Sequence, residues 1–111
     1  MPDLTPGDLC WAELDPVRGR EQSGRRPVLV VASADYLRAV TTLAIVVPVT
    51  SVDRGWPNHV PIVDPGLSRP SWAMTEQPRT LSRDRLVGVL GRVDRTTLDL
   101  VRTWLADFLT D

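Results

Sequence analysis

The chain has 111 residues, 42% of them hydrophobic, and a formal net charge of −1. This size and apolar content predict one globular domain over residues 1–111 with a single core, and they exclude a disordered chain. The balanced charge argues against a protein that coats nucleic acid through a uniformly basic surface. No segment is apolar enough to cross a membrane, and no secretory signal pattern opens the chain. We therefore expect a cytoplasmic protein without membrane contact.

The charge is distributed unevenly along the chain. Residues 18–92 contain eleven Arg and six acidic residues, whereas acidic residues outnumber Arg on either side. A phosphate-binding face is therefore expected in the central part of the chain. The single Cys10 and the single His59 are too few for an ordinary zinc site, and we predict neither a metal nor another cofactor. Cys10 itself lies in an apolar alternation and is predicted to be a small core residue.

Runs of alternating or unbroken apolar residues, separated by turn residues, predict a series of short strands. The predicted strands cover residues 7–14, 26–32, 43–50, 59–63, 71–75, 79–81 and 86–93. Pro27 suits the start of the second strand, because it has no N–H to donate. The loop over 17–25 is longer than a tight hairpin needs, which favours a functional role.

Two helical segments accompany these strands. Residues 33–40 predict a short helical turn, and Asp94 is a good N-cap for a helix that closes the chain. Apolar residues repeat along that last helix at helical spacing, at Leu98, Leu100, Val101, Trp104, Leu105 and Phe108. Because this stripe is wide for one face, we expect the helix to pack on the sheet and also to meet a partner. Many short strands and one closing helix indicate a mainly β protein, arranged as a small barrel or half-barrel, with bends at Gly88 and Gly91.

Polar side chains gather at the ends of the predicted strands. Arg26 stands at the start of the second strand, and Thr50 and Ser51 stand at the end of the third. If these strands form an antiparallel pair, Arg26 and Thr50 lie at the same edge of the sheet. They would then hold a phosphodiester while a neighbouring 2′-OH attacks phosphorus, a reaction that needs no metal. A structural alternative stays open, in which Arg26 pairs with a carboxylate and Thr50 only favours the strand.

The single histidine and the tryptophans could each have a structural or a functional role. His59 precedes an alternating strand, and a structural, hydrogen-bonded histidine is favoured over a general base. One histidine also excludes an acid–base mechanism with two histidines inside one subunit. Trp56 lies on a turn and is the best candidate for stacking on a base, whereas Trp11 and Trp104 are assigned to the core or an interface.

Four segments add a more specific signal. They are PGDLCWAELDP (6–16), GREQSGRRPVLVV (19–31), AIVVPVTS (44–51) and TEQPRT (75–80). In this order and at this spacing they resemble the opening strand, the signature loop with the second strand, the third strand and the EQ-x-R segment of one family. That family is the MazF/PemK (Kid-type) family of toxin endoribonucleases from bacterial type II toxin–antitoxin pairs.

This resemblance implies an SH3-like barrel, a homodimer and metal-independent cleavage of single-stranded RNA at short sequences. The products would carry 2′,3′-cyclic phosphate and 5′-OH ends, and the cleavage would inhibit translation and growth. The family's catalytic Arg and Thr fall on Arg26 and Thr50. The predicted RNA-binding residues, with Trp56 added for its place on a turn, are Glu21, Gly24, Arg25, Ser51, Trp56, Ser71, Glu76, Gln77 and Arg79.

The resemblance also implies partners. A cognate acidic antitoxin would fill the RNA groove with its tail, and DNA would be contacted only through that antitoxin. The loops over 51–57 and 64–70 depart from the family pattern, so the resemblance leaves the cleaved sequence open.

The general base stays unassigned at this point. A guanidinium is effectively never neutral, so Arg26 is expected to stabilise the phosphorane and the leaving oxygen. A backbone group, Thr50 through a water, or Glu21 are the candidates for the base. Two other classes of protein also stay open. One is a CcdB-type toxin, which shares the barrel and poisons DNA gyrase by binding, and the other is a plain SH3-like interaction module.

Overall fold

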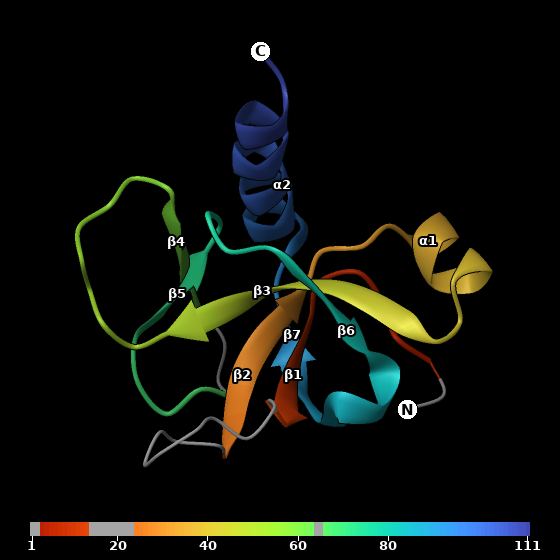
Figure 1. Ribbon diagram of the computed structural model, residues 1–111. Coiled ribbons are helices and arrows are strands. Elements are labelled where there is room, and N and C mark those ends of the chain that lie inside the picture. The colour runs from red at the N-terminus through yellow and green to blue at the C-terminus, as the bar shows by residue number, and fades with distance from the viewer. Residues whose placement is uncertain (1–2, 14–23, 64–65) are drawn as a thin grey trace, which may run out of the picture.

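The structure is a computed structural model that describes residues 3–13, 24–63 and 66–111. The described residues form a seven-stranded antiparallel sheet with two α-helices and one 3₁₀ turn (Figure 1). The strands are β1 (Asp8–Glu13), β2 (Arg25–Val30), β3 (Leu43–Thr50), β4 (His59–Ile62), β5 (Ser71–Met74), β6 (Arg79–Ser82) and β7 (Leu86–Arg92). The helical elements are α1 (Ala34–Ala39), η1 (Arg83–Arg85) and α2 (Arg95–Leu109).

The sheet follows the order β4–β5–β3–β2–β1–β7, and β6 pairs with β3 outside this path. β3 is therefore the centre of the sheet, with β2 along one edge. Its other edge pairs with β6 over residues 43–46 and with β5 over residues 49–50. This change of partner lets the sheet curl into a barrel-like form that is not closed. The predicted fold class, mainly β with a C-terminal helix, is confirmed.

The hydrophobic core consists of two clusters, because successive residues of a strand point to opposite faces of the sheet. Leu29 and Val47 belong to the first cluster, which includes residues of α2. Val28 and Val46 belong to the second cluster, which includes Leu37 of α1. The sequence predicts a single core, and the structure divides it in two since the central strands are apolar on both faces. Figure 1 shows α2 above the curled sheet and α1 to its right.

The element boundaries agree with the sequence to within two residues wherever the structure describes them. β3 covers the predicted range, and the two register shifts between β1 and β7 lie beside Gly88 and Gly91, as predicted. The Asp94 side chain accepts a hydrogen bond from the Thr97 N–H at 2.8 Å, which confirms it as the N-cap of α2. The η1 turn was not predicted. The loop residues 17–23 and the turn residues 64–65 lie outside the described part of the chain.

None of the helices in the described ranges has the length and apolar character needed to span a membrane.

Candidate active site

The pairing of β2 with β3 brings Arg26 and Thr50 together. The two strands run antiparallel, and Val28 lies opposite Pro48. Arg26 and Thr50 lie two residues beyond this last pair, each on its own strand. The predicted antiparallel pairing of the two strands is therefore present, and both residues line the same pocket.

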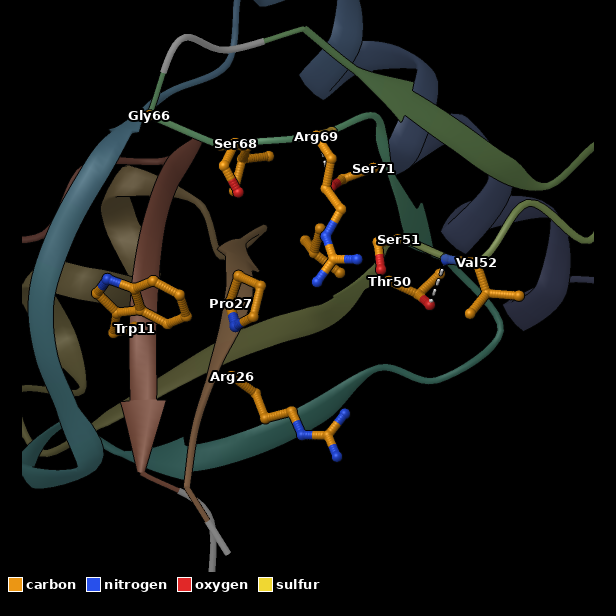
Figure 2. A pocket seen from close by; sticks show the side chains of 12 residues that line it. Trp11, Arg26, Pro27, Thr50, Ser51, Val52, Gly66, Ser68, Arg69 and Ser71 are labelled. Carbon is orange, nitrogen blue, oxygen red and sulfur yellow. Dashed lines mark hydrogen bonds between the residues drawn. The ribbon is translucent and has the colours of Figure 1, made fainter. Parts of the chain in front are cut away.

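Arg26 and Thr50 line one pocket of about 510 Å³ (Figure 2). Its described walls come from β1, the start of β2, the end of β3 and the segment 66–71 that leads into β5. The lining side chains with a guanidinium or a hydroxyl are Arg26, Thr50, Ser51, Ser68, Arg69 and Ser71. No carboxylate is found among the described lining residues. Two fixed positive charges beside hydroxyl donors suit a phosphate group.

The hydroxyl of Thr50 is oriented by its own loop. The backbone N–H of Val52 donates to Thr50 Oγ1 at 3.1 Å, in a short turn that the Thr side chain itself closes. One lone pair of the oxygen is thus occupied, and the O–H is left to donate. Thr50 is half-buried at the wall of the pocket, so its hydroxyl presents a hydrogen-bond donor to a bound anion.

The predicted RNA-binding residues near Arg26 have different positions. Ser51 is exposed and lines the pocket. Ser71 also lines it but is buried, and its hydroxyl donates to the backbone carbonyl of Arg69 at 3.0 Å. Gly24 and Arg25 are exposed beside Arg26 and are not part of the described pocket wall. Glu21 lies outside the described residues.

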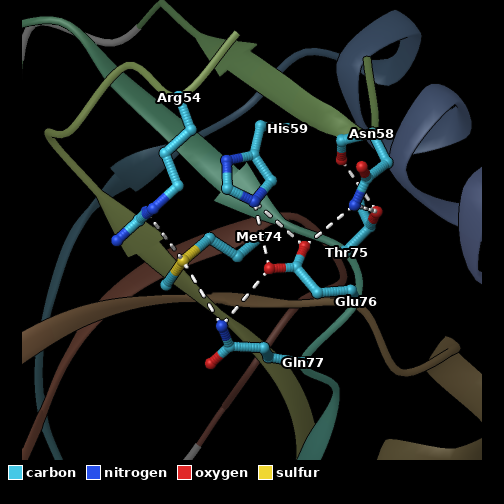
Figure 3. A network of polar contacts seen from close by, with 7 residues as sticks. All are labelled: Arg54, Asn58, His59, Met74, Thr75, Glu76 and Gln77. Atoms are coloured by element: carbon cyan, nitrogen blue, oxygen red, sulfur yellow. Dashed lines mark hydrogen bonds and ion pairs between the residues drawn. The ribbon is translucent and has the colours of Figure 1, made fainter. Parts of the chain in front are cut away.

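Glu76, Gln77 and Trp56 do not line this pocket. Glu76 and Gln77 belong to a second polar cluster (Figure 3), and Trp56 packs beside it. At its centre, the Nε2 atom of buried His59 lies 3.0 Å from each carboxylate oxygen of Glu76. The side-chain amide of Asn58 donates to Glu76 Oε1 at 2.8 Å, and that of Gln77 donates to Oε2 at 3.3 Å. The ring of Trp56 lies 4.7 Å from the His59 ring. The predicted structural role of His59 is confirmed.

The electrostatics of this second cluster favour an ionised Glu76. Burial raises the pKa of Glu76, but hydrogen bonds from His59, from its own backbone and from Gln77 outweigh it. The pKa therefore lies below its ordinary value of 4.5. Arg79, the remaining predicted RNA-binding residue, is exposed at the start of β6, opposite Val46.

Several residues of the pocket were missed or misassigned from the sequence, among them Trp11, Ser68 and Arg69. Trp11 was assigned to the core or an interface, but its half-buried side chain lines the pocket with Arg26. Arg69 was not singled out. A signal was present, because an Arg–Pro pair stands at the start of β2 and again directly before β5, as Arg26-Pro27 and Arg69-Pro70.

The remaining sequence candidates have structural roles. Trp104 packs against the first hydrophobic cluster, as predicted. Burial, with a smaller contribution from Asp8, raises the pKa of Cys10 to about 12. The thiol therefore stays protonated, and Cys10 acts as a buried core residue, as the sequence predicts.

Comparisons with known proteins give a consistent result. The model of a family described as PemK-like, MazF-like toxin of type II toxin–antitoxin system matches residues 5–109. Endoribonuclease PemK of Escherichia coli is 37% identical over 112 residues, covering 97% of this chain and 84% of its own. The endoribonuclease toxin MazF of Escherichia coli K12 is 33% identical over 103 residues, covering 92% of this chain and 88% of its own. A crystal structure of MazE–MazF (form II) from Deinococcus radiodurans has a TM-score of 0.81 at 34% identity, and the match covers 96% of this chain and 95% of that one.

Proposed function

The chain belongs to the PemK-like, MazF-like family of type II toxins, and from this membership we propose that it is a sequence-specific endoribonuclease that cleaves single-stranded RNA. The observation that carries the proposal is the pocket that Arg26 and Thr50 share at the ends of β2 and β3. The printed names of several relatives, among them PemK, MazF and EndoA, support the same class of reaction. Cleavage of cellular RNA would inhibit translation and growth.

The proposed reaction is a transfer within the RNA. The 2′-OH attacks the adjacent phosphorus, so that an O2′–P bond forms and the P–O5′ bond breaks. The products are a 2′,3′-cyclic phosphate and a 5′-OH. Arg26 stabilises the negative charge of the phosphorane through its fork of N–H donors, and the Thr50 O–H donates to a phosphate oxygen. No metal is required, because the RNA supplies the nucleophile and Arg26 supplies the positive charge.

Two protons must move in this reaction, one from the 2′-OH and one to O5′. A guanidinium only donates hydrogen bonds and has no acceptor for a proton, so neither Arg26 nor Arg69 serves as the base. The described lining residues include no carboxylate and no imidazole. The candidates for the base are a backbone group, Thr50 acting through a water, and Glu21, which lies outside the described residues.

The proposed partners follow from the charge and the apolar surface. A cognate antitoxin with an acidic tail would fill the cationic pocket, which the complex of MazE with MazF in a similar structure supports. A homodimer would cover part of the apolar surface of α2, on which Leu100, Phe108 and Leu109 are exposed. Light scattering at micromolar concentration tests the dimer directly.

The deciding experiment incubates the purified protein with RNA in excess EDTA. We expect cleavage at a short sequence, with 3′ fragments that carry a 5′-OH and 5′ fragments that carry a cyclic phosphate. Arg26→Ala, purified in the same way, is the control for a contaminating nuclease. Intact RNA in EDTA, or cleavage that appears only when a divalent cation is added, would contradict the proposal. Mapping the ends also identifies the cleaved sequence.

A further inference from the structure

The pocket contains a second guanidinium that the reaction above does not use. Arg69 lies in the segment before β5, and its side chain lines the same pocket as Arg26 and Thr50. Figure 2 shows the two arginines entering from opposite rims, with the Arg69 side chain extending toward Ser51. A bound strand that crosses the pocket from Arg26 to Thr50 would therefore meet Arg69 as well.

The backbone of Arg69 is held in place from two sides. Pro70 restricts the residue before it to extended conformations. Buried Ser71 donates its hydroxyl to the Arg69 carbonyl at 3.0 Å. β5 then pairs with β3, with Trp72 opposite Thr50. The positions of Arg69 and Thr50 are thus fixed to each other through one pair of strands.

The charge of Arg69 is not neutralised within the described chain. Several other arginines are satisfied there: Arg38, Arg92 and Arg95 each pair with an aspartate, and Arg83 donates to backbone carbonyls. The Arg69 guanidinium has no ion pair or hydrogen bond to any described residue. Arg26 lines the same pocket, whose described lining residues include no carboxylate, so an anion between the two guanidiniums would be attracted by both charges.

We propose that Arg69 binds the phosphate next to the scissile one, so that Arg26 and Arg69 grip two successive phosphates of the same RNA strand. The inference rests on the proposed function, since it assigns Arg26 to the reacting phosphate. Arg69 then anchors the strand beside the reacting phosphate and contributes to the affinity for RNA. It acts in binding and not in the reaction itself, because its guanidinium does not touch the reacting atoms.

The test compares wild type with Arg69→Gln in two measurements. The first is the affinity for a fluorescent oligonucleotide of the cleaved sequence that carries 2′-O-methyl groups and cannot be cut, measured at several salt concentrations. We expect Arg69→Gln to bind about tenfold more weakly at low salt, and the slope of log K against log salt to fall by about 0.7, the value for one phosphate contact on a single strand. The second is the single-turnover rate at saturating cleavable RNA, which we expect to stay within about threefold, because only binding is lost.

Two further variants make the result specific. Arg38→Gln removes the same charge from α1, outside the pocket wall, and should leave the affinity and the slope unchanged. Arg69→Lys keeps the charge and should keep the salt slope. Arg69 and Arg38 are both exposed, so we expect Arg69→Gln, Arg69→Lys and Arg38→Gln to fold like wild type. Thermal melting checks this.

The outcomes separate this inference from the proposed function. An Arg69→Gln protein with the wild-type affinity and salt slope overturns the inference and leaves the nuclease proposal standing. A lower saturating rate at unchanged affinity overturns it too, because Arg69 would then act on the reaction itself. If wild type binds the oligonucleotide through Arg69 but cuts no RNA, the nuclease proposal fails and the phosphate contact stands.

Discussion

At the scale of single residues, Arg26 combines a fixed position with a fixed shape. Its guanidinium presents a planar fork of donors that matches two oxygens of a phosphate, which an ammonium group does not. We therefore expect Arg26→Lys to lose activity nearly as severely as Arg26→Ala, by roughly 100- to 1000-fold, the usual cost of removing one such donor. Since Arg26 is exposed, both variants should melt close to wild type. Single-turnover cleavage measures the effect, and near-normal activity in Arg26→Lys would mean that charge alone suffices.

Thr50 offers a cleaner substitution, because Val has nearly its shape and favours a strand equally well. Thr50→Val removes the hydroxyl of a residue that lines the pocket and, with it, the acceptor for the Val52 N–H. We expect activity to fall by at least about 100-fold, as for a lost oxyanion donor, with a small change in melting temperature. Thr50→Ser keeps the hydroxyl and should retain most of the activity. A Thr50→Val protein that cuts RNA at the wild-type rate would remove Thr50 from the site.

The sequence predicts part of the pocket and misses the rest for a physical reason. Arg26 and Thr50 could be placed together, since an antiparallel pairing of two neighbouring apolar strands needs only local reasoning. The Arg69-Pro70 pair marks Arg69 only as a candidate, and neither Arg69 nor Trp11 could be placed in the pocket, because their segments are positioned by the way β1 and β5 pair across the sheet. Residues far apart in sequence meet here through strand register, which composition and spacing do not encode.

At the scale of elements, β4 and the end of β5 are tied by one charged contact. Glu76, just after β5, accepts from His59 at the start of β4. Its pKa is lowered on folding, so its ionised form stabilises the folded state above pH 4.5, and this contribution is lost as the pH falls further. Glu76→Gln should therefore be less stable than wild type at pH 7. The difference should shrink as the pH is lowered through 4.5, as measured by urea unfolding. A difference that stays constant with pH would show that the charge of Glu76 contributes nothing.

Some strands and turns could be predicted from the sequence, and others could not. β3 was predicted at its observed bounds, because an apolar run rich in Ile and Val is flanked by polar residues on both sides. Its change of partner from β6 to β5 was not predicted, since it depends on where two later strands join the sheet. The η1 turn was missed, and one of the bonds that hold it comes from a distant segment, since the Arg83 N–H donates to the Thr42 carbonyl at 2.9 Å.

At the scale of the whole molecule, the chain is nearly neutral, yet its pocket is cationic. An acidic antitoxin tail should therefore bind where RNA binds, and salt should weaken it by screening. We expect such a peptide, titrated against the protein with labelled uncleavable RNA bound, to displace the RNA. The Arg26→Ala protein should also bind both the peptide and the RNA more weakly than wild type does. Occupation of the protein by peptide and RNA together would show that inhibition acts from a remote surface.

The double pairing of β3 has a consequence for how the site fails. Val46 is paired with β2 on one side and with β6 on the other, so amide protons near it should exchange with solvent only when the entire protein unfolds. Among the described residues, Thr50, at the end of the same strand, is paired only with Trp72 of β5. Substitutions that weaken the pairing of β5 with β3 should therefore loosen the catalytic end of β3 before they unfold the protein, and activity should fall before the melting temperature does.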